Sequence, residues 1–124
     1  MCVGCGMALL GCKTPTYRYG DSIEATYGRR TLTARLPVTV RVPAAMAALD
    51  EVLRDRGYTV LETAVTEDAG RCVSRAPRFT SYPRMVTEMR QTASACVVTM
   101  RNEPFGDQDQ VEQMMRALVE RLGL

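Results

Sequence analysis

The sequence predicts an α+β domain built as a two-layer sandwich, in which an antiparallel sheet of about five strands has two helices packed on one face. Three observations lead to this prediction. Residues 31–42 alternate apolar and polar side chains, two later segments repeat apolar residues at helical spacing, and four further β-rich runs are separated by short turns. The 124 residues, 46% hydrophobic and 24% charged, suit one folded domain, which we place at residues 31–124.

The first strand and the first helix of this domain are expected to follow each other directly. Over residues 31–42 the period of two is typical of a strand with one solvated face, and Pro37 indicates an edge position or a bulge because proline lacks an amide hydrogen. Pro43 suits the first turn of a helix, and Gly57 suits its C-terminal cap. The apolar stripe of this helix is Ala45, Met46, Leu49, Val52 and Leu53.

Four more strands and a second helix complete the predicted domain. The strands are expected at 58–66, 71–76, 84–91 and 95–102, and the short turns between them require mostly antiparallel neighbours. The second helix follows Asp107, whose side chain is expected to cap it. Its apolar stripe is Val111, Met114, Met115, Leu118, Val119 and Leu122.

The N-terminal segment differs in character from the rest of the chain. Residues 1–11 are apolar and uncharged, whereas residues 12–30 are polar and rich in turn-forming residues, so we expect a signal-peptide remnant followed by a tether. The aromatic and basic residues of this tether are expected to lie along a membrane headgroup layer or along the domain, and the alternative is stacking on nucleic-acid bases. These residues are Tyr17, Arg18, Tyr19, Tyr27, Arg29 and Arg30.

Short motifs in the chain resemble a known family. Leu9-Leu10-Gly11-Cys12 resembles the lipobox of bacterial lipoproteins. Gly57-Tyr58-Thr59-Val60, and the run from Met100 that ends in Phe105-Gly106-Asp107, are similar to a family of small bacterial lipoproteins classed as a domain of unknown function. The resemblance implies that Cys12 carries a lipid and anchors the protein in a membrane of the bacterial cell envelope, facing the periplasm. That family has no assigned activity, so the resemblance implies location and fold but no chemistry.

The composition argues against an enzyme. The chain has no histidine, which excludes Ser-His-Asp and Cys-His arrangements, and it contains no glycine-rich phosphate loop. We therefore expect neither catalytic residues nor a cofactor. Neighbouring carboxylates do occur, and we interpret them as solvated surface groups; they are Asp50, Glu51, Asp55, Glu67 and Asp68.

The cysteines allow two interpretations. If Cys12 is lipidated and the residues before it are removed, Cys72 and Cys96 remain in an oxidising compartment. A meander would place strand 84–91 between them, a separation of about 9.6 Å, beyond the range of about 4.4–6.8 Å for bridged Cα atoms. We therefore expect buried free thiols. In the alternative, a zinc or iron–sulfur site uses Cys2, Cys5 and Cys12 with Cys72 or Cys96.

Arginine is the residue type that could carry a function, because fifteen arginines accompany a single lysine. Guanidinium groups bind phosphate and carboxylate bidentately, so a sheet face rich in arginine could dock lipid headgroups, an acidic partner or nucleic acid. The alternative is a solvated face with cross-strand Arg–Glu pairs. The arginines expected on the face opposite the helices are Arg35, Arg41, Arg71, Arg75, Arg84, Arg90 and Arg101.

Two functions fit these observations. The first is an envelope lipoprotein, anchored through Cys12, with a non-catalytic structural or accessory role. The second is a cytoplasmic module that binds anions or nucleic acid through the arginine-rich face. The net charge of +2 is too small to favour nucleic acid by itself.

Overall fold

The computed structural model describes residues 15–20, 22–78, 83–104 and 107–124. These residues form seven strands and two helices. In chain order they are β2 (Thr16–Tyr19), β3 (Ile23–Gly28), β4 (Thr31–Pro37), α1 (Val42–Asp55), β5 (Thr59–Val65), β6 (Ala69–Arg75), β7 (Arg84–Gln91), β8 (Ala95–Glu103) and α2 (Gln108–Arg121).

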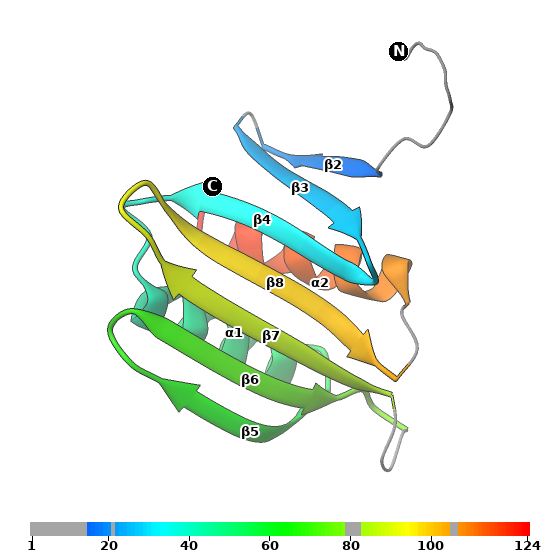
Figure 1. Cartoon of the computed structure of the whole chain (residues 1–124). Helices are drawn as coiled ribbons and strands as arrows, with labels where there is room; N and C mark the ends of the chain where they lie inside the picture. Colours follow the sequence, from blue (N-terminus) through cyan, green and yellow to red (C-terminus); the bar gives the residue numbers. More distant parts are fainter. Residues whose placement is uncertain (1–14, 21, 79–82, 105–106) are drawn as a thin grey trace, which may run out of the picture.

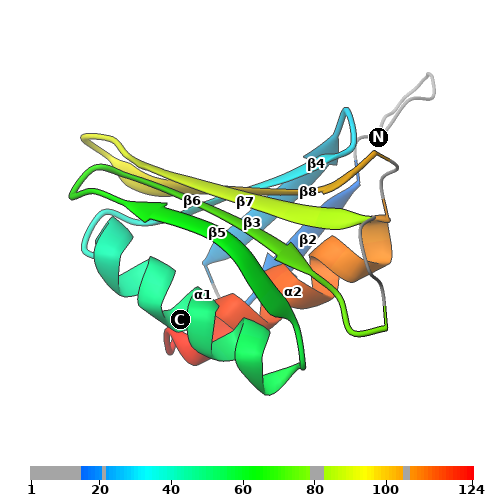
Figure 2. The same cartoon turned by 90° about the horizontal axis from the view of Figure 1, so that it is seen from below.

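The seven strands form one antiparallel sheet with the order β2-β3-β4-β8-β7-β6-β5 (Figure 1). β5 to β8 form a meander, and α1 leads the chain from β4 to the edge strand β5. Both helices pack on the same face of the sheet (Figure 2). The predicted two-layer α+β sandwich is therefore confirmed, but the sheet has seven strands in place of about five. The opposite face, which no described helix covers, is called the open face below.

The two additional strands, β2 and β3, lie in the segment that we expected to be a tether. They bury Tyr19, Ile23 and Ala25 against the helices, so apolar side chains alternate with polar ones along this hairpin. β2 has only four residues and β3 has six, and turn-forming residues separate them. The alternation of apolar and polar residues is therefore too short to recognise in the sequence. The expectation of a linker is therefore corrected over residues 16–28.

The boundary between β4 and α1 also differs from the prediction. β4 ends at Pro37, because the amide of Val40 donates a hydrogen bond to the Pro37 carbonyl at 2.9 Å and closes a turn. Pro37 does not mark a sheet edge, since β4 lies between β3 and β8, but it lies beyond the last β4 residue paired with β3. Arg41 becomes the N-cap residue of α1, without a side-chain capping bond.

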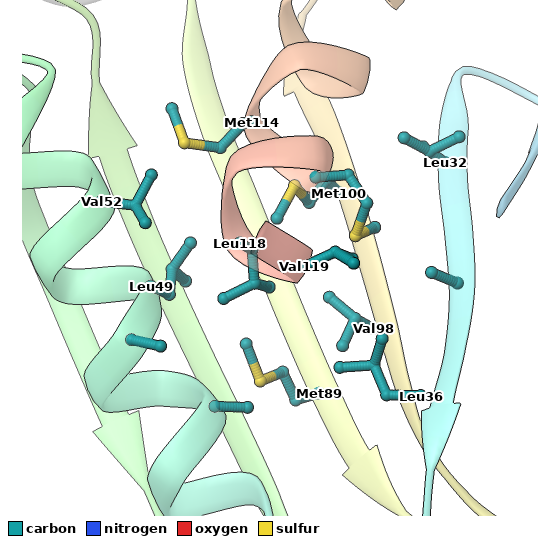
Figure 3. Close-up of a cluster of buried hydrophobic side chains, with 14 of the residues drawn as sticks. Leu32, Leu36, Leu49, Val52, Met89, Val98, Met100, Met114, Leu118 and Val119 are labelled. Carbon is teal, nitrogen blue, oxygen red and sulfur yellow. The ribbon is translucent and has the colours of Figure 1, made fainter. Parts of the chain in front are cut away.

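The core lies between the two helices and the sheet (Figure 3). Leu118 of α2 points into the space between α1 and the central strands, and its side chain is fully buried. Gly70 of β6 lets α1 approach closely, because a Cβ at this position would lie 2.7 Å from the Cγ and Sδ atoms of Met46. Six methionines are buried in this layer: Met46, Met85, Met89, Met100, Met114 and Met115.

A small polar network fixes the start of α2. Asp107 caps the helix as predicted, accepting a hydrogen bond from the Gln110 amide at 3.1 Å. The Gln110 side chain accepts a hydrogen bond from Asn102 Nδ2 and donates one to the Tyr58 hydroxyl, both at 2.6 Å. Asn102 is only 4% exposed, so this network satisfies an amide that bulk water does not reach. Phe105 and Gly106, the rest of the Phe-Gly-Asp motif, lie outside the described residues.

Cys72 and Cys96 are buried free thiols, as predicted. They lie on β6 and β8, and β7 runs between these strands. Burial raises the pKa of both thiols above the ordinary value. Both thiols are therefore held in the protonated form that reacts poorly with oxidants and electrophiles.

The free energy of unfolding is expected to fall as the pH rises above about 9. Burial, with a smaller contribution from the Asp50 carboxylate, raises the pKa of Cys72 from 9.0 to about 11. Between these values the unfolded chain releases a thiol proton that the folded chain keeps, so the stabilisation is complete below the lower value and is lost above it. Urea unfolding at about pH 7.5 and about pH 10 measures this fall, which should be smaller in Cys72→Ala. An equal fall in both proteins would contradict the prediction.

Candidate functional site

Six of the seven predicted arginines occupy open-face positions in the sheet. Arg35 pairs in register with Val97, Arg71 with Glu88, and Arg101 with Val86. The other three are Arg75, Arg84 and Arg90. Arg41 is the exception and corrects the prediction, because β4 ends four residues before it.

Carboxylates neutralise the centre of the open face. Arg71 contacts Glu62 at 3.4 Å (Nη1–Oε1) and Glu88 at 3.5 Å (Nε–Oε2). Arg101 contacts the other oxygen of Glu88 at 3.1 Å, and Glu103 at 2.9 Å. These contacts form a chain of alternating charge from β5 to β8. This part of the face matches the alternative of cross-strand Arg–Glu pairs, each worth at most about 1 kcal/mol at a solvated surface.

The environment of Arg101 fixes its charge. Burial alone would lower its pKa, but its hydrogen bonds to Glu103 and Glu88 outweigh burial and raise the pKa above the usual arginine value. The guanidinium is therefore committed to these two carboxylates. An incoming anion would have to displace these carboxylates, so the net free energy of its binding would be small.

A shallow hollow of about 500 Å³ lies on the open face, next to the Arg71–Glu88 part of this charge chain. Arg71, Glu88 and Arg90 border it, and small side chains from β5, β6 and β8 also line it. Arg90 is exposed, and no described carboxylate pairs with it. Arg35, on the other side of Val97, donates a hydrogen bond to Ser94 Oγ at 2.9 Å. The lining residues are Ala64, Thr66, Ala69, Gly70, Arg71, Glu88, Met89, Arg90, Val97 and Thr99.

A row of threonines crosses the rest of the open face, and the sequence analysis missed it. The registers pair Thr16 with Thr26, Thr26 with Thr33, and Thr33 with Thr99, across β2, β3, β4 and β8. The row continues into Glu88 and Arg71 on β7 and β6. No pattern within a single strand indicates such a row, because it exists only through the register between strands.

The tyrosines of the N-terminal hairpin pack on the domain itself. Tyr19 is buried; its hydroxyl donates to the Glu112 carbonyl at 3.4 Å, and the Arg116 guanidinium lies 5.9 Å from its ring centre. The Tyr17 hydroxyl is hydrogen-bonded to Gln108 Nε2, and Tyr27 is half-buried against the core. These contacts leave the rings poorly placed to stack on nucleic-acid bases.

The turn between β3 and β4 has an unusual backbone. It is a two-residue hairpin loop, and both of its residues have positive φ, 53° at Arg29 and 64° at Arg30. Such turns favour Asn-Gly, because a residue with a branched or long side chain in the left-handed region costs on the order of 1 kcal/mol. Two exposed arginines thus occupy the tip of this hairpin at a cost in stability.

The carboxylates that the sequence analysis assigned to the surface mostly form ion pairs there. Asp50 pairs with Arg54 at 2.9 Å within α1. Glu51 and Asp55 both pair with Arg121 of α2, which joins the two helices at the surface. Within residues 15–20, 22–78, 83–104 and 107–124, no group of three or more Cys, Asp or Glu side chains is placed to hold a metal ion.

Cys12 and the other residues of the lipobox-like motif lie outside the described part of the chain, as do Cys2 and Cys5. Among the described residues, no helix has the length and apolar character needed to cross a membrane. A scan against protein-family models and a search of curated proteins find no match to this chain.

Proposed function

We propose that this protein is a membrane-anchored lipoprotein of the bacterial cell envelope, held by a lipid on Cys12, with a non-catalytic structural or accessory role. The observation that carries the proposal is Leu9-Leu10-Gly11-Cys12, a cysteine preceded by the small and aliphatic residues typical of a lipobox. An apolar stretch precedes this motif and a polar segment follows it.

The spacing between Cys12 and the domain determines where the domain would lie once the lipid is attached. β2 begins at Thr16, four residues after Cys12, so the covalent chain allows at most about 14 Å between the two Cα atoms. A folded domain that starts this close to the anchor would stay at the membrane surface. Its ordered part would therefore act on partners within or next to that surface.

The competing proposal, a cytoplasmic module that binds anions through the open face, has less support. Arg71 and Arg101 are each paired with two carboxylates, and Arg41 is not on the face. The remaining hollow beside Arg90 is shallow and bordered by Glu88 as well as by arginines.

Metabolic labelling with palmitate tests the proposed function. Protein expressed from its native gene, with any in-frame codons upstream included, is expected to incorporate label and to fractionate with membranes. Cys12→Ala should abolish both results, because the thiol is the acylated atom. Cys5→Ala is the matched control and should keep them, since Cys5 lies before the cleavage site. An unlabelled wild-type protein in the cytosol would contradict the proposal and favour the cytoplasmic module.

A further inference from the structure

The chain enters the sheet at the end that carries the Arg29–Arg30 turn. The Tyr27 amide donates a hydrogen bond to the Pro15 carbonyl at 2.9 Å, and Arg29 follows two residues after Tyr27. The start of β2, the β3–β4 turn and the last residues of β8 lie along the same end of the sheet, at the right of Figure 1. Arg30 Nη1 also donates to the Pro104 carbonyl at 3.4 Å, which joins the turn to the end of β8.

Arginines continue along this same end of the sheet. Glu103 pairs in register with Arg84, and Arg84 with Arg75, so the ends of β8, β7 and β6 are aligned. Arg78 follows β6 and, like the two turn arginines, is exposed with a positive φ, here 77°. No carboxylate of the described residues pairs with Arg29, Arg30 or Arg78. We call these three residues the basic end.

The opposite end of the sheet carries charges of both signs. The β5–β6 hairpin turns there through Glu67 and Asp68, both of them exposed. Arg35 and Arg90 also lie near this end, on β4 and β7. The basic end is the one from which the chain leads back to Cys12.

We propose that the basic end contacts the phosphate groups of anionic phospholipids and makes the domain stand with its strands pointing away from the membrane. This inference rests on the proposed function, because the anchor at Cys12 determines which end is close to the bilayer. Three residues separate Cys12 from Thr16, so the turn arginines lie within reach of the headgroups to which a lipid on Cys12 would belong. Arginine matches phosphate geometrically through its planar group of donors.

The backbone of the turn is the independent observation that favours this contact. Asn-Gly would relieve the left-handed strain at positions 29 and 30, yet two long cationic side chains occupy them. Strained positions of this kind are found where the side chains serve a function at the expense of stability. Here the strained turn carries two exposed arginines at the end where the chain enters the sheet.

The experiment measures how the full chain carrying Cys12→Ala, which has no lipid, partitions onto vesicles. Vesicles of about 30% phosphatidylglycerol in phosphatidylcholine are compared with pure phosphatidylcholine vesicles, at low and at near-physiological salt. Binding is expected only to the anionic vesicles, and it should weaken as salt screens the charges. Binding to neutral vesicles alone, or no binding at low salt, would overturn the inference. Palmitate labelling tests the anchor separately, so a failure of the proposed function can be told from a failure of this inference.

Two variants with equal charge loss locate the contact. Arg29→Asn combined with Arg30→Gly should lower the partition coefficient roughly 25-fold at low salt, about fivefold for each arginine. The same variant should raise the melting temperature by a few degrees, because Asn-Gly relieves the strain, so weaker binding could not be blamed on unfolding. Arg29→Lys with Arg30→Lys should keep most of the binding.

The matched control is Arg35→Gln combined with Arg90→Gln, which removes the same charge from the open face near the opposite end. With both variants compared at about 0.1 M salt, where the Debye length is about 10 Å, this control should change the partition coefficient less than about threefold, since its side chains lie about 20 Å along the strands from the basic end. Equal losses from both variants would mean that only total charge matters and would overturn the inference. A larger loss of binding in the control variant would place the contact on the open face and would also overturn the inference.

Discussion

Leu118→Asp is expected to unfold the domain. Leu118 has no solvent exposure and lies where α2 packs between α1 and the central strands, close to Leu49 and Met89 in Figure 3. The substitution removes apolar packing and buries a carboxylate without a partner, which together cost several kcal/mol out of a typical total of about 5–15 kcal/mol. Circular dichroism during heating should show no cooperative transition near that of the wild type.

Gln113→Asp is the control for this prediction. Residue 113 is on the same helix but exposed, so the same charge there should move the melting temperature by only a few degrees. If Leu118→Asp melted like the wild type, α2 would not dock on the sheet as described. If both variants lost their transitions, a new carboxylate anywhere in α2 would be the cause, independent of burial.

Gln110→Leu is expected to lower the free energy of unfolding by about 1–3 kcal/mol. The Gln110 side chain joins α2 to β8 and to the segment between α1 and β5, because it is bonded to Asn102 and to Tyr58 at 2.6 Å each. Leucine makes neither bond and leaves the Asn102 amide buried without this partner. The change should appear as a lower urea midpoint with an unaltered slope.

A double-mutant cycle separates the hydrogen bond from the loss of the side chain. Asn102→Leu alone should also destabilise, but Gln110→Leu combined with Asn102→Leu should cost less than the sum of the two, because no amide remains unsatisfied. Tyr58→Phe supplies the second arm and removes only the hydroxyl partner. Additive costs in the Asn102 cycle would show that the 2.6 Å contact contributes nothing.

The elements that could be predicted are those whose apolar periodicity runs through one long, continuous stretch of sequence. Five of the six predicted apolar positions lie in α2 at helical spacing, Leu122 is its C-cap, and Asp107 caps its start as expected. The meander followed from short turns between β-rich runs, and this topology in turn predicted that Cys72 and Cys96 would be free. In each case the information lies within about a dozen residues, where periodicity and turn chemistry act directly.

The short N-terminal hairpin was not predictable in the same way. β2 has four residues and β3 has six, so neither offers a period long enough to stand out from polar neighbours. Their stability depends on distant partners, since Tyr19 is covered by α2 and β3 pairs with β4, which is itself held by β8. Isolated hairpins of this length are at best marginally stable, which is why the same residues look like a linker when taken alone.

The sequence by itself determined the α+β class, the two helices, the meander and the resemblance of residues 9–12 to a lipobox, because each of these depends on neighbouring residues. Only the tertiary structure decided which charges meet. The register between strands places Glu88 between Arg71 and Arg101, which neutralises the centre of the open face. The same register aligns four threonines and puts the Arg29–Arg30 turn at the end where the chain enters the sheet. These outcomes depend on contacts between residues far apart in the chain, and the periodicity of a single strand contains no information about them.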